Sequence, residues 1–183
     1  MIDPTRCNRR TAVATMATLL TAGPNLWAAD PAAKKRLAVV TTVWRNRSHA
    51  WHMAERFLAG YPKEGKWYRP PIEVVSAYVD QQPDGDLSKQ RAAEFKFPLY
   101  GSIAEALRCG GKQLAVDAVL IIGEHGNYEK SQFGQTKYPR YEFFKQVAQV
   151  YREEKKSLPT FHAKHPSWNW DCATEMYDTT REL

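Results

Sequence analysis

The chain has 183 residues, 43% of them hydrophobic, and a formal net charge of +6 at neutral pH. Its length suits one ordinary domain, and its hydrophobic content argues against a disordered chain. Because lysine and glutamate are interspersed along most segments, the charge does not predict a nucleic-acid-binding protein, which usually carries a concentrated basic stripe.

The first 29 residues have the pattern of an export signal. Arg9 and Arg10 precede a short apolar run over 11–23, and the small residues Ala28 and Ala29 follow it. A charged start, an apolar middle and a small-residue end are typical of a secretory signal, and the paired arginines indicate the twin-arginine route. We therefore expect a bacterial protein that is periplasmic or secreted, with no other membrane attachment and a linker over 30–35. A disordered tail is the alternative interpretation.

From residue 36 onwards, segments of strand type alternate with segments of helix type. Continuous β-branched runs are typical of buried parallel strands, and Ser48, Asp86 and Ser102 are of the type that caps a helix. Strands are predicted over 36–43, 72–79, 97–100, 116–123 and 158–163, helices over 48–58, 87–94, 102–108, 140–155 and 170–183, and loops over 61–71 and 124–139.

This alternation predicts an α/β fold over residues 36–183. Strands joined by helices form parallel sheets with right-handed crossovers, so we expect a three-layer, doubly wound, Rossmann-like domain of about five strands. Cys109 and Cys172 fall in predicted helices. Their spacing does not show whether they pair, and we expect two half-buried free thiols.

All five histidines are predicted to follow the carboxyl ends of strands, where open α/β sheets bind ligands. His49 with His52, and His162 with His165, have H-x-x-H spacing, and His125 adjoins Glu124. Such groups can hold zinc. Without a C-x-x-C or H-E-x-x-H pattern we assign no metal, and a histidine-based metal-dependent enzyme remains an alternative. Tryptophans in the same segments either stack on a ligand or pack under loops, namely Trp44, Trp51, Trp168 and Trp170.

The order of these elements resembles a known family. Asp80 ends the second strand, and the stretches over 91–100, 102–107 and 116–122 follow it in the order found in the nucleotide-binding domain of the glucose-fructose oxidoreductase and inositol dehydrogenase (Gfo/Idh/MocA) family. Within that family the chain looks closest to uncharacterised secreted bacterial relatives. The resemblance covers about 36–183 and implies NAD or NADP as cofactor, a sugar or polyol-like substrate, and a C-terminal substrate domain that is absent here.

The resemblance also implies functional residues at the carboxyl edge. Lys164 lies where the family has its Glu-Lys-Pro motif, so Lys164 and the adjacent His165 are the candidate catalytic residues. Asp80 would bind the ribose of the cofactor, while an arginine and the start of the first helix would bind its phosphate groups. A glycine would allow the cofactor to approach the backbone closely. The candidate cofactor-binding residues are Thr42, Arg45, Ser48, Asp80, Gly123 and His125.

Two departures from the family pattern lead us to expect a degenerate domain. The segment 41–48 contains no glycine, although the family has a glycine-rich turn there, and Ala163 replaces the motif's glutamate. We therefore expect an NAD(P)-dependent oxidoreductase-like domain that is incomplete as a catalyst. A non-enzymatic domain that binds a small molecule is the second hypothesis. Loss of the second domain would expose apolar surface, so a homo-oligomer is a further expectation.

Overall fold

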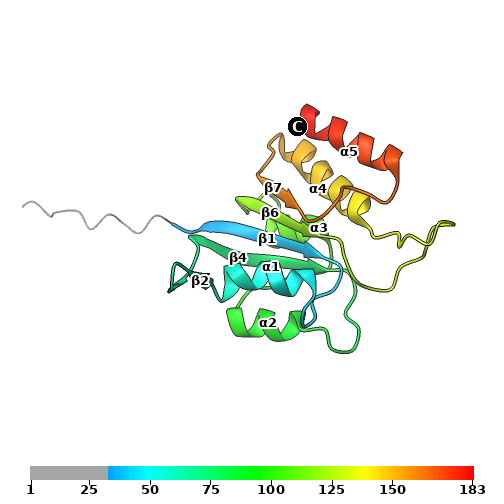
Figure 1. Cartoon of the computed structure of the whole chain (residues 1–183). Coiled ribbons are helices and arrows are strands. Elements are labelled where there is room, and N and C mark those ends of the chain that lie inside the picture. Colours follow the sequence, from blue (N-terminus) through cyan, green and yellow to red (C-terminus); the bar gives the residue numbers. More distant parts are fainter. Residues whose placement is uncertain (1–32) are drawn as a thin grey trace, which may run out of the picture. The chain divides into compact units, whose positions relative to one another are not determined.

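The computed structural model describes residues 33–183, and Lys34–Leu183 forms one compact unit (Figure 1). The export signal predicted over 1–29 lies outside the described residues. The predicted linker over 30–35 is too long at its end, because the first strand already begins at Lys35. Among the residues that the structure describes, no helix combines the length and apolarity that crossing a bilayer requires.

The predicted parallel sheet is present. Its five strands lie in the order β5-β4-β1-β6-β7, and every neighbouring pair is parallel. The order reverses between β1 and β6, which is the topological switch point of a doubly wound fold and the place where such folds bind ligands. The strands are β1 (Lys35–Thr41), β4 (Ile72–Val79), β5 (Leu99–Tyr100), β6 (Ala118–Ile122) and β7 (Thr160–His162).

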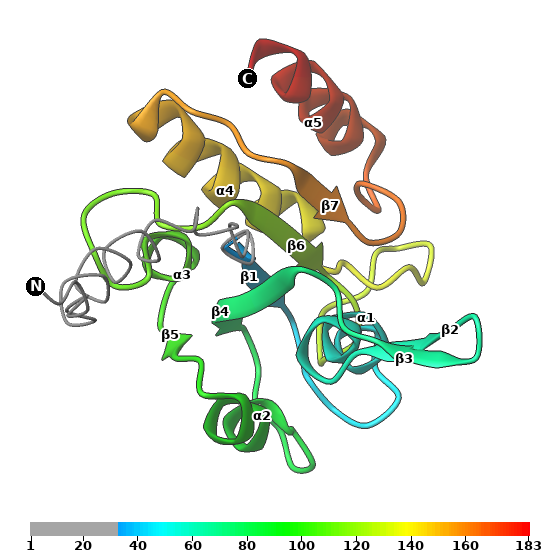
Figure 2. The same cartoon turned by 90° about the vertical axis from the view of Figure 1, so that its left-hand side faces the viewer.

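Helices cover both faces of this sheet and give the expected three layers. Figures 1 and 2 show α1 (His49–Leu58) and α2 (Ser88–Phe95) on one face, and α3 (Ile103–Arg108) and α4 (Arg140–Glu154) on the other. The last helix, α5 (Trp170–Glu182), packs on α4 through Met176. The α/β, Rossmann-like fold class predicted from the sequence is therefore confirmed.

Serine side chains cap α1 and α3, as predicted. The Oγ of Ser48 accepts a hydrogen bond from the backbone N–H of Trp51, and the Oγ of Ser102 accepts one from Glu105, both at 3.2 Å. These contacts satisfy N–H groups that a helix cannot satisfy itself. Asp86 instead lies two residues before α2, where its carboxylate accepts from the backbone of Ser88.

One predicted loop contains regular structure. Within 61–71, the strands β2 (Tyr61–Lys63) and β3 (Lys66–Tyr68) form an antiparallel hairpin. Its turn residues Glu64 and Gly65 both have positive φ, at 51° and 72°. Two such residues are required by the tight turn whose twist matches a hairpin.

An apolar groove lies beside α1 on its face of the sheet. It has a volume of about 540 Å³, and Met53 and Phe57 of α1 and Phe161 of β7 line it. Phe161 is 58% exposed. Exposure of apolar surface through loss of a second domain, and oligomerisation, both stay predictions.

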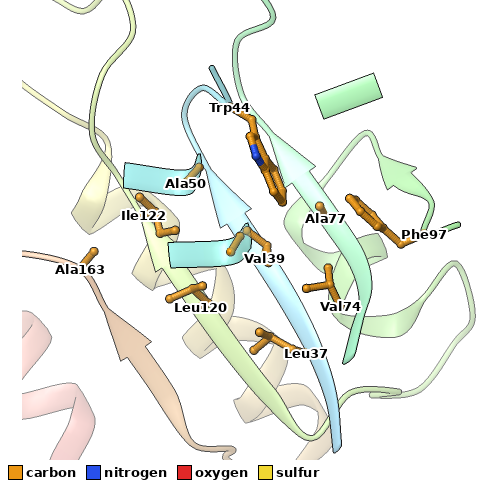
Figure 3. Close-up of a cluster of buried hydrophobic side chains, with 11 residues drawn as sticks. Leu37, Val39, Trp44, Ala50, Val74, Ala77, Phe97, Leu120, Ile122 and Ala163 are labelled. Carbon is orange, nitrogen blue, oxygen red and sulfur yellow. The ribbon is translucent and has the colours of Figure 1, made fainter. Parts of the chain in front are cut away.

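Trp44 fills the core directly after β1. Its side chain is fully buried and stacks on Phe97 with ring centroids 6.0 Å apart (Figure 3). Its backbone N–H donates to Asp86 at 2.8 Å, which ties the end of β1 to the start of α2. Of the two roles open to this tryptophan, the structure shows packing.

Replacing this indole should therefore destabilise the domain. We expect Trp44→Ala to lower the free energy of unfolding by about 3–5 kcal/mol, because it leaves a large cavity. Trp170→Ala is the matched control, since Trp170 is 83% exposed. Urea unfolding followed by circular dichroism measures both, and equal stabilities would contradict the packing role.

Candidate functional site

The carboxylate of Glu124 is the centre of the carboxyl edge. Glu124 follows β6 directly after Gly123, and its Oε1 accepts a hydrogen bond from Nη2 of Arg140 at 2.8 Å. Its Oε2 is in close contact with Nδ1 of His49. The hydroxyl of Thr42, at the end of β1, donates to its backbone carbonyl. Glu124 thus connects β1, β6, α1 and α4.

Arg140 is the partner that the sequence analysis missed. It is the first residue of α4, and its side chain is only 2% exposed. Burial lowers the pKa of its guanidinium, and the charge of Glu124 opposes that shift. The charge is therefore tolerated in the interior because a carboxylate accompanies it.

Gly123 accommodates this ion pair. A Cβ at this position would lie 2.6 Å from Cγ of Arg140, so the glycine makes room for the arginine. We predicted that Gly123 allows a ligand to approach the backbone. That role stays a prediction, because the structure shows only that the glycine accommodates the side chain of Arg140.

His165 lies on the far side of Arg140. Its Nδ1 is 2.9 Å from the carbonyl of Ser167 and must therefore carry the proton, which leaves Nε2 to accept from Nη1 of Arg140 at 3.1 Å. Lys164, the other candidate catalytic residue, is exposed and has a φ of 70°. The structure therefore places His165, but not the side chain of Lys164, in the Glu124–Arg140 network.

Only some of the five histidines converge. The rings of His49 and His125 stack with centroids 5.2 Å apart, and Nε2 of His162 donates to the backbone carbonyl of Arg140. His52 is exposed and lies edge-on to Trp51. His52 is exposed while His49 stacks on His125, so the structure does not bring the H-x-x-H pair His49 and His52 to one point.

Positive charges gather around His125. Burial lowers the pKa of this imidazole, and the charges of His49, Arg45 and Lys164 lower it further. Glu124 acts in the opposite direction. Both Arg45 and Lys164 are exposed, so their side chains remain in contact with water.

A polar pocket opens beside the Glu124–Arg140 pair. Its volume is about 420 Å³, within the range of small-molecule sites. Tyr138 and Trp168 contribute aromatic rings, and the ring of Tyr138 lies 5.2 Å from Cζ of Arg140. The lining residues are Glu124, Gln135, Thr136, Tyr138, Arg140, His165, Ser167 and Trp168.

The carboxylate of Asp80, which we predicted to bind a ribose, is already hydrogen-bonded to other side chains of the protein. Its two carboxylate oxygens accept hydrogen bonds from the hydroxyls of Tyr78, at 2.7 Å, and Tyr128, at 2.6 Å. Burial, together with this carboxylate, raises the pKa of Tyr78 to about 12 and that of Tyr128 further. Next to Asp80, the side-chain amide of Gln81 forms two hydrogen bonds with the backbone of Asn127.

These contacts close the crevice at the switch point. They join the end of β4 to the loop after β6 and cross the end of β1, where a dinucleotide lies in Rossmann-type domains. The remaining space next to Arg45 and Gly126 is only about 290 Å³. Thr42 is buried and Ser48 is used as a helix cap. The residues in this conformation therefore do not fit NAD or NADP, and binding of either cofactor stays a prediction.

Cys109 and Cys172 are half-buried free thiols, as expected. Arg36 lies 3.4 Å from the sulfur of Cys109. Neither cysteine takes part in the network around Glu124.

No protein-family model matches this chain, and no curated protein matches its sequence. Among solved structures, it is similar to a biliverdin reductase of Synechocystis, solved in complex with biliverdin and NADP+, with a TM-score of 0.47 and 13% sequence identity. The similarity covers 81% of this chain and 35% of that one, so the chain spans about a third of the reductase. Membership of the Gfo/Idh/MocA family stays a prediction.

The buried His162 should make the domain sensitive to acid. Burial lowers the pKa of His162 below its ordinary value of 6.5, so the unfolded chain takes up this proton more readily than the folded one. Stability is therefore fully present above this ordinary value and falls as the pH drops through the lower folded pKa. We expect His162→Gln to reduce the loss of stability over this window in urea titrations. An unchanged slope of stability against pH would contradict the assignment.

Opening the contact between Tyr128 and Asp80 should favour nucleotide binding. We expect Tyr128→Ala to strengthen NADH binding about tenfold, because it frees a carboxylate oxygen and the space over β1. Quenching of tryptophan fluorescence measures the affinity, with Tyr177→Ala on exposed α5 as control. Tight NADH binding by the unaltered chain, with no gain in Tyr128→Ala, would show that the crevice is not closed.

Proposed function

We propose that the domain binds a neutral, polyol- or sugar-like molecule in the pocket beside Glu124 and Arg140, and that it does so outside the cytoplasm after export through its N-terminal signal. The observation that carries this proposal is the ion pair in the pocket wall. Its two charges lie 2.8 Å apart and neutralise one another, so this wall of the pocket favours an uncharged ligand.

The rest of the pocket suits a molecule with many hydroxyl groups. Gln135, Thr136 and Ser167 supply further donors and acceptors, and Trp168 supplies a ring surface. Small-molecule sites commonly combine aromatic walls with a few placed polar groups. A ligand with a net charge would instead have to compete for one member of the Glu124–Arg140 pair.

Hydride transfer is not part of this proposal. The free nitrogen of His165 already accepts from Arg140, so it is not available to take a proton from a substrate. An NAD(P)-dependent oxidoreductase-like activity is the second candidate. The strand order, which places a switch point between β1 and β6, is the observation that favours it.

Binding of neutral polyols tests the first candidate. We expect saturation-transfer NMR to detect myo-inositol or glucose on the full chain, and Trp168→Ala to weaken binding at least about tenfold. Trp67→Ala is the control, because this exposed tryptophan belongs to the β2–β3 hairpin outside the pocket.

Two results would contradict the proposal that the pocket binds a polyol. No transfer to any neutral polyol up to its solubility limit would contradict the proposal, as would equal binding by Trp168→Ala and the unaltered chain. Oxidation of a polyol upon addition of NAD or NADP would favour the second candidate.

A further inference from the structure

We propose that His49, Glu124 and His125 together bind one divalent transition-metal ion. One ligand atom from each of these residues lies within 4.8 Å of the other two. They come from two places that the fold brings together, the start of α1 and the loop directly after β6. The inference rests on this geometry and holds whether or not the adjoining pocket binds a polyol.

One buried imidazole nitrogen in this cluster lacks a hydrogen-bond partner. This atom is Nε2 of His125, whereas the buried Nδ1 of His49 is in close contact only with Glu124, the third member of the cluster. Leaving a buried polar atom unpaired is costly, and such atoms call for an explanation such as a bound ion. A metal ion at the edge of the two stacked rings would use the lone pair of His125 and would replace the contact between His49 and Glu124.

Glu124 is held in an orientation that suits a metal ligand. Arg140 donates to its Oε1, while its Oε2 points to the side of His49. The hydroxyl of Thr42 fixes the backbone of the same residue. Outer contacts of this kind orient the ligands of metal sites and preserve their geometry.

The donor set indicates which ions fit. Two imidazole nitrogens and one carboxylate oxygen suit Zn²⁺ or Co²⁺, whereas Ca²⁺ and Mg²⁺ prefer sites made of oxygen alone. Tetrahedral zinc places its ligand atoms about 3.4 Å apart, so His49 and Glu124 must move slightly apart on binding while wider separations in the cluster shorten. The side chain of His49 is 33% exposed, which leaves a coordination position for water or a small ligand.

Nearby positive charges lower the affinity of this site for a metal ion but do not prevent binding. Arg45 and Lys164 act electrostatically on His125, as its lowered pKa shows. Both side chains are exposed, so water and salt screen their charges. Salt should therefore strengthen metal binding, in contrast to a site that depends on exposed carboxylates.

Calorimetric titration of the chelator-treated full chain with Zn²⁺ alone tests the proposal. We expect one site that is weakened at least tenfold in each of His49→Gln, His125→Gln and Glu124→Gln. The matched control is His52→Gln, on the same helix but exposed, which should bind like the unaltered chain. Circular dichroism of each variant reports whether it folds.

A second measurement avoids variants that fail to fold. In histidine-selective ¹⁵N NMR of the unaltered chain, Zn²⁺ should shift the ring nitrogens of His49 and His125 and leave those of His52 unchanged. Zinc affinity that survives in both folded variants, His49→Gln and His125→Gln, would overturn the proposal. Zinc-dependent shifts at His52, or at neither His49 nor His125, would also overturn it.

Discussion

A buried guanidinium group constrains the whole carboxyl edge of this sheet. Arg140 is almost fully enclosed, and an enclosed charge is tolerated only next to an opposite charge with satisfied hydrogen bonds. Glu124 supplies the opposite charge and is thereby fixed at the end of β6, while Nε of Arg140 is buried without a hydrogen-bond partner. The same pair sets the start of α4 and the position of His165, while the second carboxylate oxygen faces His49.

Glu124 therefore belongs to two neighbouring sites. On the side of Arg140 its charge is neutralised, and the pocket with Trp168 offers neutral polar groups. On the side of His49 it adjoins two imidazoles, and Nε2 of His125 is buried without a partner, which favours a cation. The His49 side lies at the switch point between β1 and β6, and the contacts of Tyr128 and Gln81 close the neighbouring part of the crevice over the end of β4. The pocket with Trp168 lies instead between the loops that follow β6 and β7.

The sequence predicted the sheet well because strands and helices have local signals. Ile72–Val79 and Ile103–Arg108 were placed with their observed bounds, since a β-branched run and a serine cap define them. The hairpin at Tyr61–Tyr68 was missed, although Gly65 after a polar residue is a recognisable turn signal. The role of Arg140 had no local signal. It depends on how the loop over 124–139 returns to the sheet, which periodicity does not reveal.

The central claim is that one carboxylate organises both neighbouring sites, and a charge-neutral replacement tests it most directly. Glu124→Gln should weaken zinc binding and polyol binding together, while Glu129→Gln, in the same loop with an exposed side chain, should change neither. A folded Glu124→Gln variant that binds zinc and polyol like the unaltered chain would contradict the account.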